Sequence, residues 1–288
     1  MLSFENFGII GRFGNQLFQY AFLRTQAERL GVKFHCPHWI GDEIFNLNDH
    51  DIRVSHATGI TNRYVEPLEK DYNRTQVELP DGTDVTGYFE SENNFDVVKV
   101  RSWYAFKQEK MAVVREKYGA IVSNNSIGLH CRFGDKVGRG KFYCPRIGYY
   151  REALKIVDSG EGSVLVFSDD IEVARKFLSP LPYQFVFVQN NEYWEDFYIL
   201  TLCRDFICSP STFAWWGAWL GSSPEKRIIF PREGMFRPLG PMRNKDLIPD
   251  HWVKLQALIP VLDSYPIAGT IFRFKNRARI VASPFFAK

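Results

Sequence analysis

Hydrophobic and polar positions along the second half of this chain form short blocks that predict strands and helices in turn. The predicted strands cover residues 127–131, 164–167, 185–188, 206–208 and 227–230, and the predicted helices cover 149–157, 171–177, 193–204 and 213–220. Regular alternation of this kind is typical of an α/β fold, in which a parallel sheet carries helices on both faces.

The first half begins with a strand, a turn, a helix and a second strand. We predict a strand from Phe7 to Ile10, a helix from Asn15 to Leu30 and a strand from Val32 to Cys36. Gly31 is a natural stop for the helix. Residues 41–85 are polar and rich in Asn, Asp and Thr, which predicts loops and short strands.

These patterns divide the chain into three parts. A polar run at 123–126 crosses between the halves, so we predict a Rossmann-like domain over residues 1–122 and another over residues 123–262. The remaining tail, residues 263–288, is basic and aromatic. Its part from 267 to 288 has the composition of a segment that lies on an anionic membrane surface, and the alternative is that it packs across the first domain.

Composition narrows the class of protein. Of the 288 residues, 45% are hydrophobic and 16% aromatic, which is ample material for a globular core. The formal net charge of +3 gives no general attraction to nucleic acid, and we expect no such partner. No apolar run reaches the roughly 18 residues that span a bilayer. The N-terminus lacks a basic region followed by an apolar signal core, so we expect a cytoplasmic location, peripheral at a membrane if the tail binds one.

Nothing in the sequence marks a metal site. The five cysteines are odd in number and fit buried, reduced thiols, and no Cys-x-x-Cys pair or His-rich cluster offers a zinc site. Adjacent Asp169 and Asp170 follow a predicted strand, where a helix N-cap with its dipole partner is a simpler interpretation than a metal site. We therefore expect no metal ion and no cofactor.

Three short stretches have the shape of a phosphate or nucleotide grip: Gly11–Gln16, His130–Asp135 and Ser209–Gly217. In the first, Gly11 and Gly14 let the backbone turn tightly and approach a ligand, and the helix that follows presents free N–H groups. Arg12 adds a forked donor, and the Asn15 amide both donates and accepts. The alternative is a plain strand-to-helix turn.

In the second stretch, His130 and Arg132 flank Cys131 on a strand that points at the carboxyl edge of the sheet. The two-residue period of a strand puts both side chains on one face, where they can reach the same anionic ligand. The alternatives are a hydrogen-bonded core histidine at His130 and a salt bridge from Arg132 to Asp135.

The third stretch places the hydroxyls of Ser211 and Thr212, and the backbone of Phe213, at the start of a helix. Such a turn caps the helix, binds phosphate, or does both. Trp215 and Trp219 lie four residues apart on that helix, which favours core packing.

Upstream, Asp196 shares a predicted helix face with apolar residues, and a carboxylate there needs a partner. The N1–H and exocyclic amine of guanine form a donor pair that suits a carboxylate. The alternative is that Asp196 favours the helix dipole from the first turn.

Four stretches together resemble a known family. They are Gly11–Ala21, Gly87–Glu92, Phe167–Asp170 and Ser211–Leu220. In this order they resemble the α-1,2-fucosyltransferases of glycosyltransferase family 11, and the likeness extends to about residue 252. The resemblance implies a GT-B-like fold of two Rossmann-like domains facing a cleft, GDP-fucose as donor, a glycan hydroxyl as acceptor, inversion at the anomeric carbon and no metal requirement.

The resemblance also implies roles for individual residues. Arg132 corresponds to the arginine that holds the donor β-phosphate, and His130 and Asp196 correspond to positions that contact guanine. Ser211 and Thr212 match the turn beside the diphosphate, and Arg12 and Asn15 resemble the donor-facing loop of protein O-fucosyltransferase 1. We count Gly11, Gly14 and Phe213 with these as donor-binding residues.

One position departs from the family pattern. Family 11 has a second arginine where this chain has Phe133, and the stretch after it is similar to core α-1,6-fucosyltransferases, which carry a catalytic glutamate where this chain has Gly140. Asp135 is the leading candidate for the general base, with Glu90 and Glu92 as alternatives, and Asp135 can equally orient Arg132.

Two other function classes stay open on the sequence. The first is a sugar-nucleotide or glycan-binding relative without turnover, because of Phe133 and Gly140. The second is a dinucleotide-dependent oxidoreductase, which the absence of Gly-x-Gly-x-x-Gly spacing disfavours.

Overall fold

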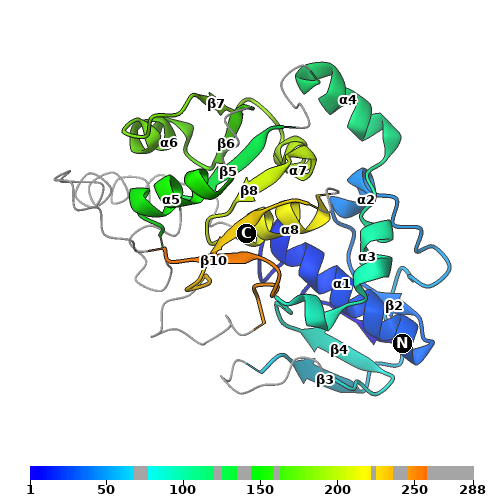
Figure 1. Cartoon of the computed structure of the whole chain (residues 1–288). Helices are drawn as coiled ribbons and strands as arrows, with labels where there is room; N and C mark the ends of the chain where they lie inside the picture. Colours follow the sequence, from blue (N-terminus) through cyan, green and yellow to red (C-terminus); the bar gives the residue numbers. More distant parts are fainter. Residues whose placement is uncertain are drawn as a thin grey trace, which may run out of the picture.

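A computed structural model describes residues 1–67, 77–119, 125–134, 144–157, 162–221, 225–235 and 246–257. The strands of these residues form two sheets, of four and six strands, and every strand pairing within them is parallel (Figure 1). The chain is therefore α/β, as its alternation of blocks predicts.

The sheet of the first half has the strand order β2-β1-β4-β3. Its strands are β1 (Leu2–Ser3), β2 (Phe34–His35), β3 (Asn62–Val65) and β4 (Thr83–Thr86). The two strands β3 and β4 fall within or beside the polar region for which loops and short strands are predicted.

The strand predicted from Phe7 to Ile10 is wrong. Backbone N–H groups of Phe7 and Ile9 bond to the carbonyls of Phe4 and Asn6, three residues back, so the segment is turned rather than extended. Gly8 has a φ of 75°, and Ile9 is 74% exposed. The apolar run resembles a buried strand in sequence, but the strand itself is the earlier Leu2–Ser3.

The sheet of the second half has the order β7-β6-β5-β8-β9-β10. Its strands are β5 (Ile127–Cys131), β6 (Val164–Ser168), β7 (Phe185–Phe187), β8 (Asp205–Ile207), β9 (Ile228–Pro231) and β10 (Val253–Leu255). Counted from β5, the order is 3-2-1-4-5-6, the Rossmann order, and it reverses between β5 and β8. Ligands of such sheets bind beyond the carboxyl ends of the two strands at the reversal.

Helices connect most of the successive strands in both halves of the chain. They follow the chain as α1 (Phe13–Leu30), α2 (Gly41–Ile44), α3 (Val97–Trp103), α4 (Gln108–Tyr118), α5 (Ile147–Val157), α6 (Ile171–Leu178), α7 (Tyr193–Leu202) and α8 (Thr212–Leu220), with a short 3-10 turn, η2, at Glu92–Asn94. Residues of α5 and α6 pack in one apolar cluster, and those of α1, α7 and α8 pack in another.

The predicted elements of the second half are confirmed, with ends that differ by one or two residues. The alternation does not predict β10, because Val253–Leu255 is a three-residue edge strand whose side chains are largely exposed and carry no clear period. The helix α3 is also absent from the prediction.

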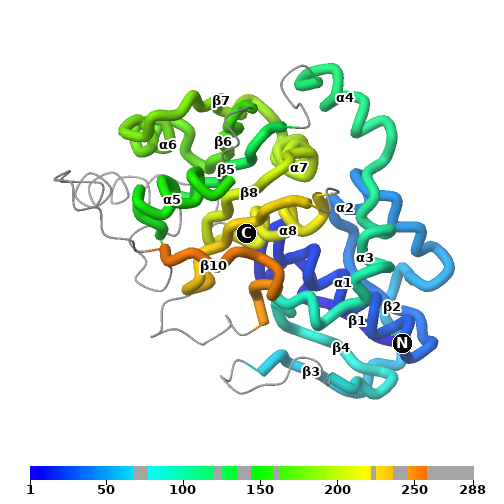
Figure 2. Tube along the Cα trace, viewed as in Figure 1, coloured from blue at the N-terminus to red at the C-terminus, as the bar shows by residue number. Residues whose placement is uncertain are grey.

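The larger cluster joins the two halves of the chain. The ring of Phe18 on α1 lies 4.7 Å from those of Trp215 and of Trp216 on α8. Trp215 also stacks on Trp219, with ring centres 5.9 Å apart and planes 12° from parallel. The predicted core role of the tryptophans is confirmed. Figure 2 shows α1 and α8 close together at the centre of the molecule, between the two sheets.

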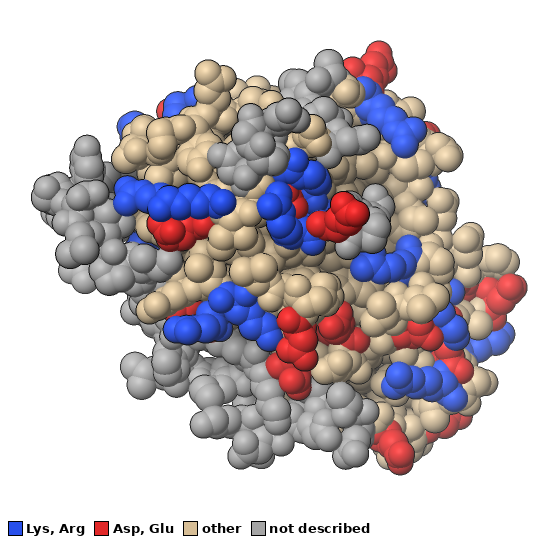
Figure 3. Space-filling model, viewed as in Figure 1, with Lys and Arg blue, Asp and Glu red and all other residues tan. Residues whose placement is uncertain are grey.

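Two boundary predictions concern residues outside the described ranges. The predicted domain boundary after residue 122 falls within 120–124, and the tail 263–288 lies outside as well, so both stay predictions. On the face seen in Figure 3, lysine and arginine side chains lie among aspartates and glutamates. In the described part of the chain, no helix combines the length and the apolar composition that a bilayer crossing requires.

Candidate functional site

The second and third predicted grips meet where the order of the larger sheet reverses. His130 lies on β5, and Ser209 lies two residues past the end of β8 at Ile207. The His130 Nδ1 atom is 2.6 Å from the Ser209 hydroxyl oxygen. Both residues are buried, with His130 6% exposed. This bond joins the carboxyl ends of the two strands that flank the reversal, which is the ligand-binding position of an open α/β sheet.

The first grip meets the third through two helix N-termini. A Cβ added to Gly14, in the first turn of α1, would lie 2.5 Å from the backbone nitrogen of Phe213 and 2.6 Å from the carbonyl carbon of Thr212, at the start of α8. Gly14 is therefore required for the contact between the two helices, and its predicted approach to a ligand stays a prediction. Gly11, with a φ of 134°, is required for the turn itself.

Asn15 links three segments at this contact. Its Oδ1 atom accepts a hydrogen bond of 2.7 Å from the Thr212 hydroxyl, and its Nδ2 atom lies 3.4 Å from a carboxylate oxygen of Glu90. Glu90 belongs to the turn that follows β4 and is 3% exposed. Residues from the turn after β4, from α1 and from α8 thus share one polar contact between the halves of the chain.

Arg12 and Ser211 are close in sequence to this contact, whereas Arg132 belongs to the second predicted grip. Arg12 is the residue before the first turn of α1, and its carbonyl accepts from the backbone N–H groups of Asn15 and Gln16. Arg132 follows β5 and is partly buried. Ser211 precedes α8, is 1% exposed, and makes no side-chain bond to the helix backbone.

Phe213 serves aromatic packing. Its ring centre is 5.3 Å from that of Phe197, 6.0 Å from that of His130 and 6.3 Å from that of Phe13. These rings come from α7, β5 and α1, so Phe213 fixes the three grips relative to one another.

Phe133, the position at which this chain departs from the family pattern, points into the core. It is 8% exposed, and its ring lies 5.2 Å from that of Phe177 on α6. Its backbone N–H and that of Gly134 donate to the two carboxylate oxygens of Asp169, at 2.8 and 3.0 Å. Asp169 therefore fixes the turn after β5, whereas it is predicted as a helix dipole partner. The predicted N-cap is confirmed at Asp170, which accepts from Val173.

Asp196 lies in the first turn of α7, the placement on which the helix-dipole alternative rests, and it has protein partners. It accepts 2.8 Å from the Asn191 amide, whose oxygen in turn accepts from the Tyr118 hydroxyl of α4. Burial raises the pKa of Asp196 to about 6, against the lowering effect of the Asn191 bond. No described contact joins Asp196 directly to the three grips, and its neighbour Phe197 provides the link, because the ring of Phe197 packs on those of Phe13 and Phe213.

The candidate bases differ in their surroundings. Asp135 lies outside the described residues. Glu90 is buried against Asn15, and a carboxylate oxygen of Glu92 accepts 3.0 Å from the Trp219 indole. The roles of all three stay predictions.

Within the described residues, neither the cysteines nor any group of possible metal ligands marks a second functional site. None of the five cysteines, all of which lie in the described ranges, forms a disulfide bond, and four of them are buried. Burial raises the pKa of the Cys36 thiol to about 12, which makes it a poor nucleophile. Within the described ranges, no three histidine, cysteine or acidic side chains gather as a metal site. Metal independence stays a prediction.

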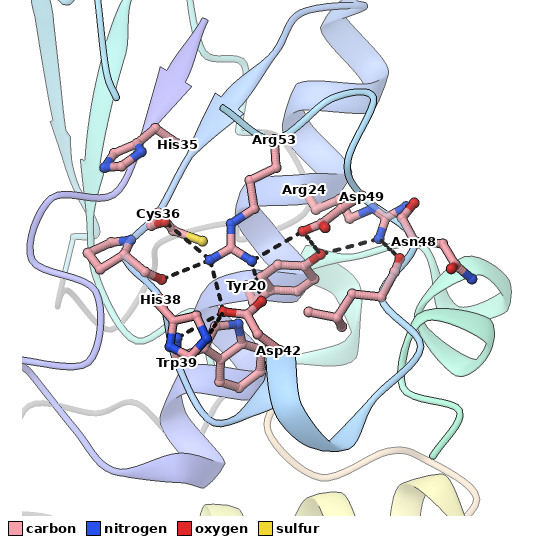
Figure 4. A network of polar contacts seen from close by, with 12 residues as sticks. Tyr20, Arg24, His35, Cys36, His38, Trp39, Asp42, Asn48, Asp49 and Arg53 are labelled. Carbon is pink, nitrogen blue, oxygen red and sulfur yellow. Dashed lines mark hydrogen bonds and ion pairs between the residues drawn. The ribbon is translucent and has the colours of Figure 1, made fainter. Parts of the chain in front are cut away.

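A polar network that the sequence does not reveal lies at the carboxyl end of β2 (Figure 4). Arg53 pairs with Asp42 and Asp49 and donates to the carbonyls of Cys36 and Pro37, at 3.3 and 3.0 Å. It borders a hollow of about 410 Å³ that is lined by His35, His38, His50 and neighbouring residues. The partners of Arg53 lie within residues 36–49, a stretch without a clear hydrophobic period in the sequence. The network could therefore not be predicted from the sequence.

Comparison with known proteins gives the class. The model of glycosyl transferase family 11 matches residues 5–232. The chain therefore belongs to this family, and the predicted resemblance is confirmed.

Two curated relatives match part of the chain. The O-antigen biosynthesis glycosyltransferase WbnK of Escherichia coli is 31% identical over 140 residues, which are 46% of this chain and 45% of that one. An alpha-1,2-colitosyltransferase of Escherichia coli is 26% identical over 156 residues, which are 49% of this chain and 51% of that one. These matches span about half the length of each relative.

Solved structures share the fold. POFUT1 in complex with GDP matches with a TM-score of 0.53 and 12% identity, over 80% of this chain and 97% of that one. NodZ alpha-1,6-fucosyltransferase soaked with GDP-fucose matches with a TM-score of 0.50 and 13% identity, over 80% and 92%. The predicted GT-B-like fold is confirmed.

Proposed function

We propose that this protein transfers L-fucose from GDP-fucose to a hydroxyl group of a glycan, with inversion at the anomeric carbon and without a metal ion. The observation that carries the proposal is the meeting of all three grips beside the carboxyl ends of β5 and β8. The matched structures with GDP and GDP-fucose support the choice of nucleotide.

The chemical demand of this reaction is the negative charge that develops on the departing diphosphate. Cations and backbone N–H groups that are already in place stabilise such charge without reorganisation. Arg132 and Arg12 would supply the cations, and the first turns of α1 and α8 would supply N–H groups and the positive ends of two helix dipoles. We assign guanine recognition to Asp196 and His130.

In the transfer step, the acceptor oxygen forms a bond to the anomeric carbon while the bond from that carbon to the β-phosphate oxygen breaks. The electron pair of the broken bond stays with GDP, and the acceptor proton passes to a base. We propose Asp135 as this base. An Asp135→Asn variant that binds GDP but does not transfer sugar supports this role, whereas loss of GDP binding would assign Asp135 to orienting Arg132.

For the acceptor we propose a galactose-type sugar and an α-1,2 linkage, following the family and the name of the second curated relative. The hollow beside Arg53 is our candidate for acceptor binding, because it lies at the carboxyl end of β2 and is lined by hydrogen-bonding side chains. A His38→Ala variant is expected to raise the KM for the acceptor and to leave the Kd for GDP unchanged.

The decisive experiment is a transfer assay with a panel of nucleotide sugars and glycan acceptors, with the product linkage determined by NMR. We expect transfer from GDP-fucose that persists in EDTA. GDP-colitose belongs in the panel because one relative is named for colitose transfer. Transfer from a UDP-sugar alone would overturn the donor, manganese-dependent activity would overturn metal independence, and GDP binding without any turnover would indicate a non-catalytic relative.

A further inference from the structure

A strained turn follows β4 and carries Glu90. Phe89, just before Glu90, has a φ of 53°, a left-handed conformation that is rare for a bulky residue. The Glu66 carboxylate holds this turn, since one of its oxygens accepts from the backbone N–H groups of Tyr88 and Phe89 at 2.7 and 3.0 Å. The Phe89 ring also stacks on Phe22 of α1, with ring centres 3.7 Å apart. Strain of this kind persists only where surrounding contacts enforce it, and it is concentrated at functional sites.

The turn places Glu90 against Asn15. An ionised carboxylate only accepts hydrogen bonds, so it requires the NH2 side of the Asn15 amide, which lies 3.4 Å away. The amide oxygen of Asn15 then faces Thr212, at 2.7 Å, and the Thr212 hydroxyl has to donate to it. The orientation of the whole contact thus follows from the acceptor role of the Glu90 carboxylate.

This orientation decides what the contact offers to a bound anion. A hydroxyl has one hydrogen, and that of Thr212 is committed to Asn15. The amide of Asn15 retains its second N–H, and the first turn of α8 retains backbone N–H groups. If the amide were reversed, Asn15 would donate to Thr212, and the hydroxyl hydrogen would be released.

We propose that Glu90 is a positioning residue that acts through Asn15: it orients the Asn15 amide and the Thr212 hydroxyl so that Asn15 and the α8 backbone, rather than the Thr212 hydroxyl hydrogen, meet the donor diphosphate. This inference rests on the proposed function. It separates Glu90 from the general base, because Glu90 influences the donor through two other side chains and need not exchange a proton.

The test is the Glu90→Gln variant, which keeps the shape of the side chain but also donates, and therefore permits the reversed amide. We expect kcat/KM for the donor and the affinity for GDP to fall by about ten- to a hundredfold, as for loss of one hydrogen bond to a charged group. The acid limb of the pH–rate profile should stay in place. The matched control is Glu28→Gln at the far end of α1, where the carboxylate pairs with Arg24 and Lys99; its donor kinetics should match the wild type.

A double-mutant cycle decides whether Glu90 acts through Asn15. In an Asn15→Ala background, Glu90→Gln should change the affinity for GDP by less than about twofold, because the amide it orients is gone. An equal effect in both backgrounds overturns the proposal. Loss of turnover by more than about a hundredfold, together with loss of the acid limb, overturns it in favour of a base. A Glu90→Gln variant with wild-type kcat/KM for the donor and wild-type affinity for GDP also overturns the proposal.

A second double-mutant cycle measures the coupling between Glu90 and Asn15 in the absence of any donor. Urea unfolding of the same four proteins should show non-additive effects of the two substitutions, since the side chains share one contact. If the wild-type chain binds and transfers no GDP-sugar, the proposed function fails, and this cycle still measures the Glu90–Asn15 coupling. Additive unfolding effects would overturn the orientation of Asn15 by Glu90 even if transfer from GDP-fucose is found.

Discussion

Gly14 at the start of α1 lies so close to Phe213 at the start of α8 that a Cβ on Gly14 would be 2.5 Å from the Phe213 backbone nitrogen. The two helix N-termini are therefore in direct contact. Their positive ends lie side by side beside the carboxyl ends of β5 and β8, and Asn15 bonds across the contact to Thr212. A bound diphosphate would offset the repulsion between these two dipole ends.

The Gly14→Ala variant should be strongly destabilised, because a methyl group would meet backbone atoms that cannot turn away. We expect the free energy of unfolding in urea to fall by about 3 kcal/mol or more. Gly59→Ala is the control: Gly59 has a φ of 64° but no heavy atom within 4 Å of the added Cβ, and the expected cost is about 1 kcal/mol. Equal costs for the two variants would argue against the helix contact.

Affinity for GDP should depend on pH through Asp196. Guanine would bind the ionised carboxylate, and burial raises the pKa of Asp196 to about 6, so binding should weaken as pH falls through that value. The ionised fraction, and with it the association constant, should fall about tenfold from pH 7 to pH 5. Calorimetry at several pH values measures this. The Asp196→Asn variant should bind weakly at all of these pH values, which assigns the pH dependence to Asp196.

The same substitution should stabilise the free protein. The folded chain raises the pKa of Asp196, so the stability that the protonated group contributes is complete at low pH and is lost as pH rises through about 6. At pH 7.5 the free energy of unfolding of the Asp196→Asn variant should therefore be about 1–3 kcal/mol higher than that of the wild type. The difference in free energy of unfolding should shrink at pH 5. A variant less stable than the wild type at pH 7.5 would contradict the cost of burying the Asp196 carboxylate.

Arg132 should matter for transfer far more than for folding. An Arg132→Ala variant is expected to lose about a hundred- to a thousandfold in kcat, because a prearranged cation beside the leaving group is removed. Arg132→Lys should recover only part of this, since an ammonium lacks the planar fork that binds phosphate. The exposed Arg29→Ala serves as control. A fully active Arg132→Ala enzyme would remove Arg132 from the donor site.

Phe133→Arg, which restores the family residue, should harm the protein. The Phe133 side chain is buried against Phe177, so a guanidinium group there would lose its hydration. We expect the free energy of unfolding to fall by about 2–4 kcal/mol. Phe133→Leu, which keeps an apolar group, should cost about 1 kcal/mol. A stable Phe133→Arg protein with improved transfer would show that this position faces the donor.

Sequence predicts the second half of the chain better than the first for a physical reason. Strands such as Ile127–Cys131 are buried on both faces and separated by amphipathic helices, so local composition and period define them. The first half uses strands of two to four residues and long polar connections. Phe7–Ile10 shows the consequence, because an apolar run in a turn reads like a strand.

The sequence by itself determined the α/β class, the family and the three grips, because these are properties of local pattern and of residue type at fixed spacing. Only the tertiary structure decided what those residues do to one another. Gly14 gives room to α8, Phe133 faces the core, Asp169 holds the turn after β5, and Glu90 orients Asn15. Each of these contacts joins residues at least 35 positions apart. Contacts between distant segments depend on how helices and sheets pack, and no local pattern encodes that packing.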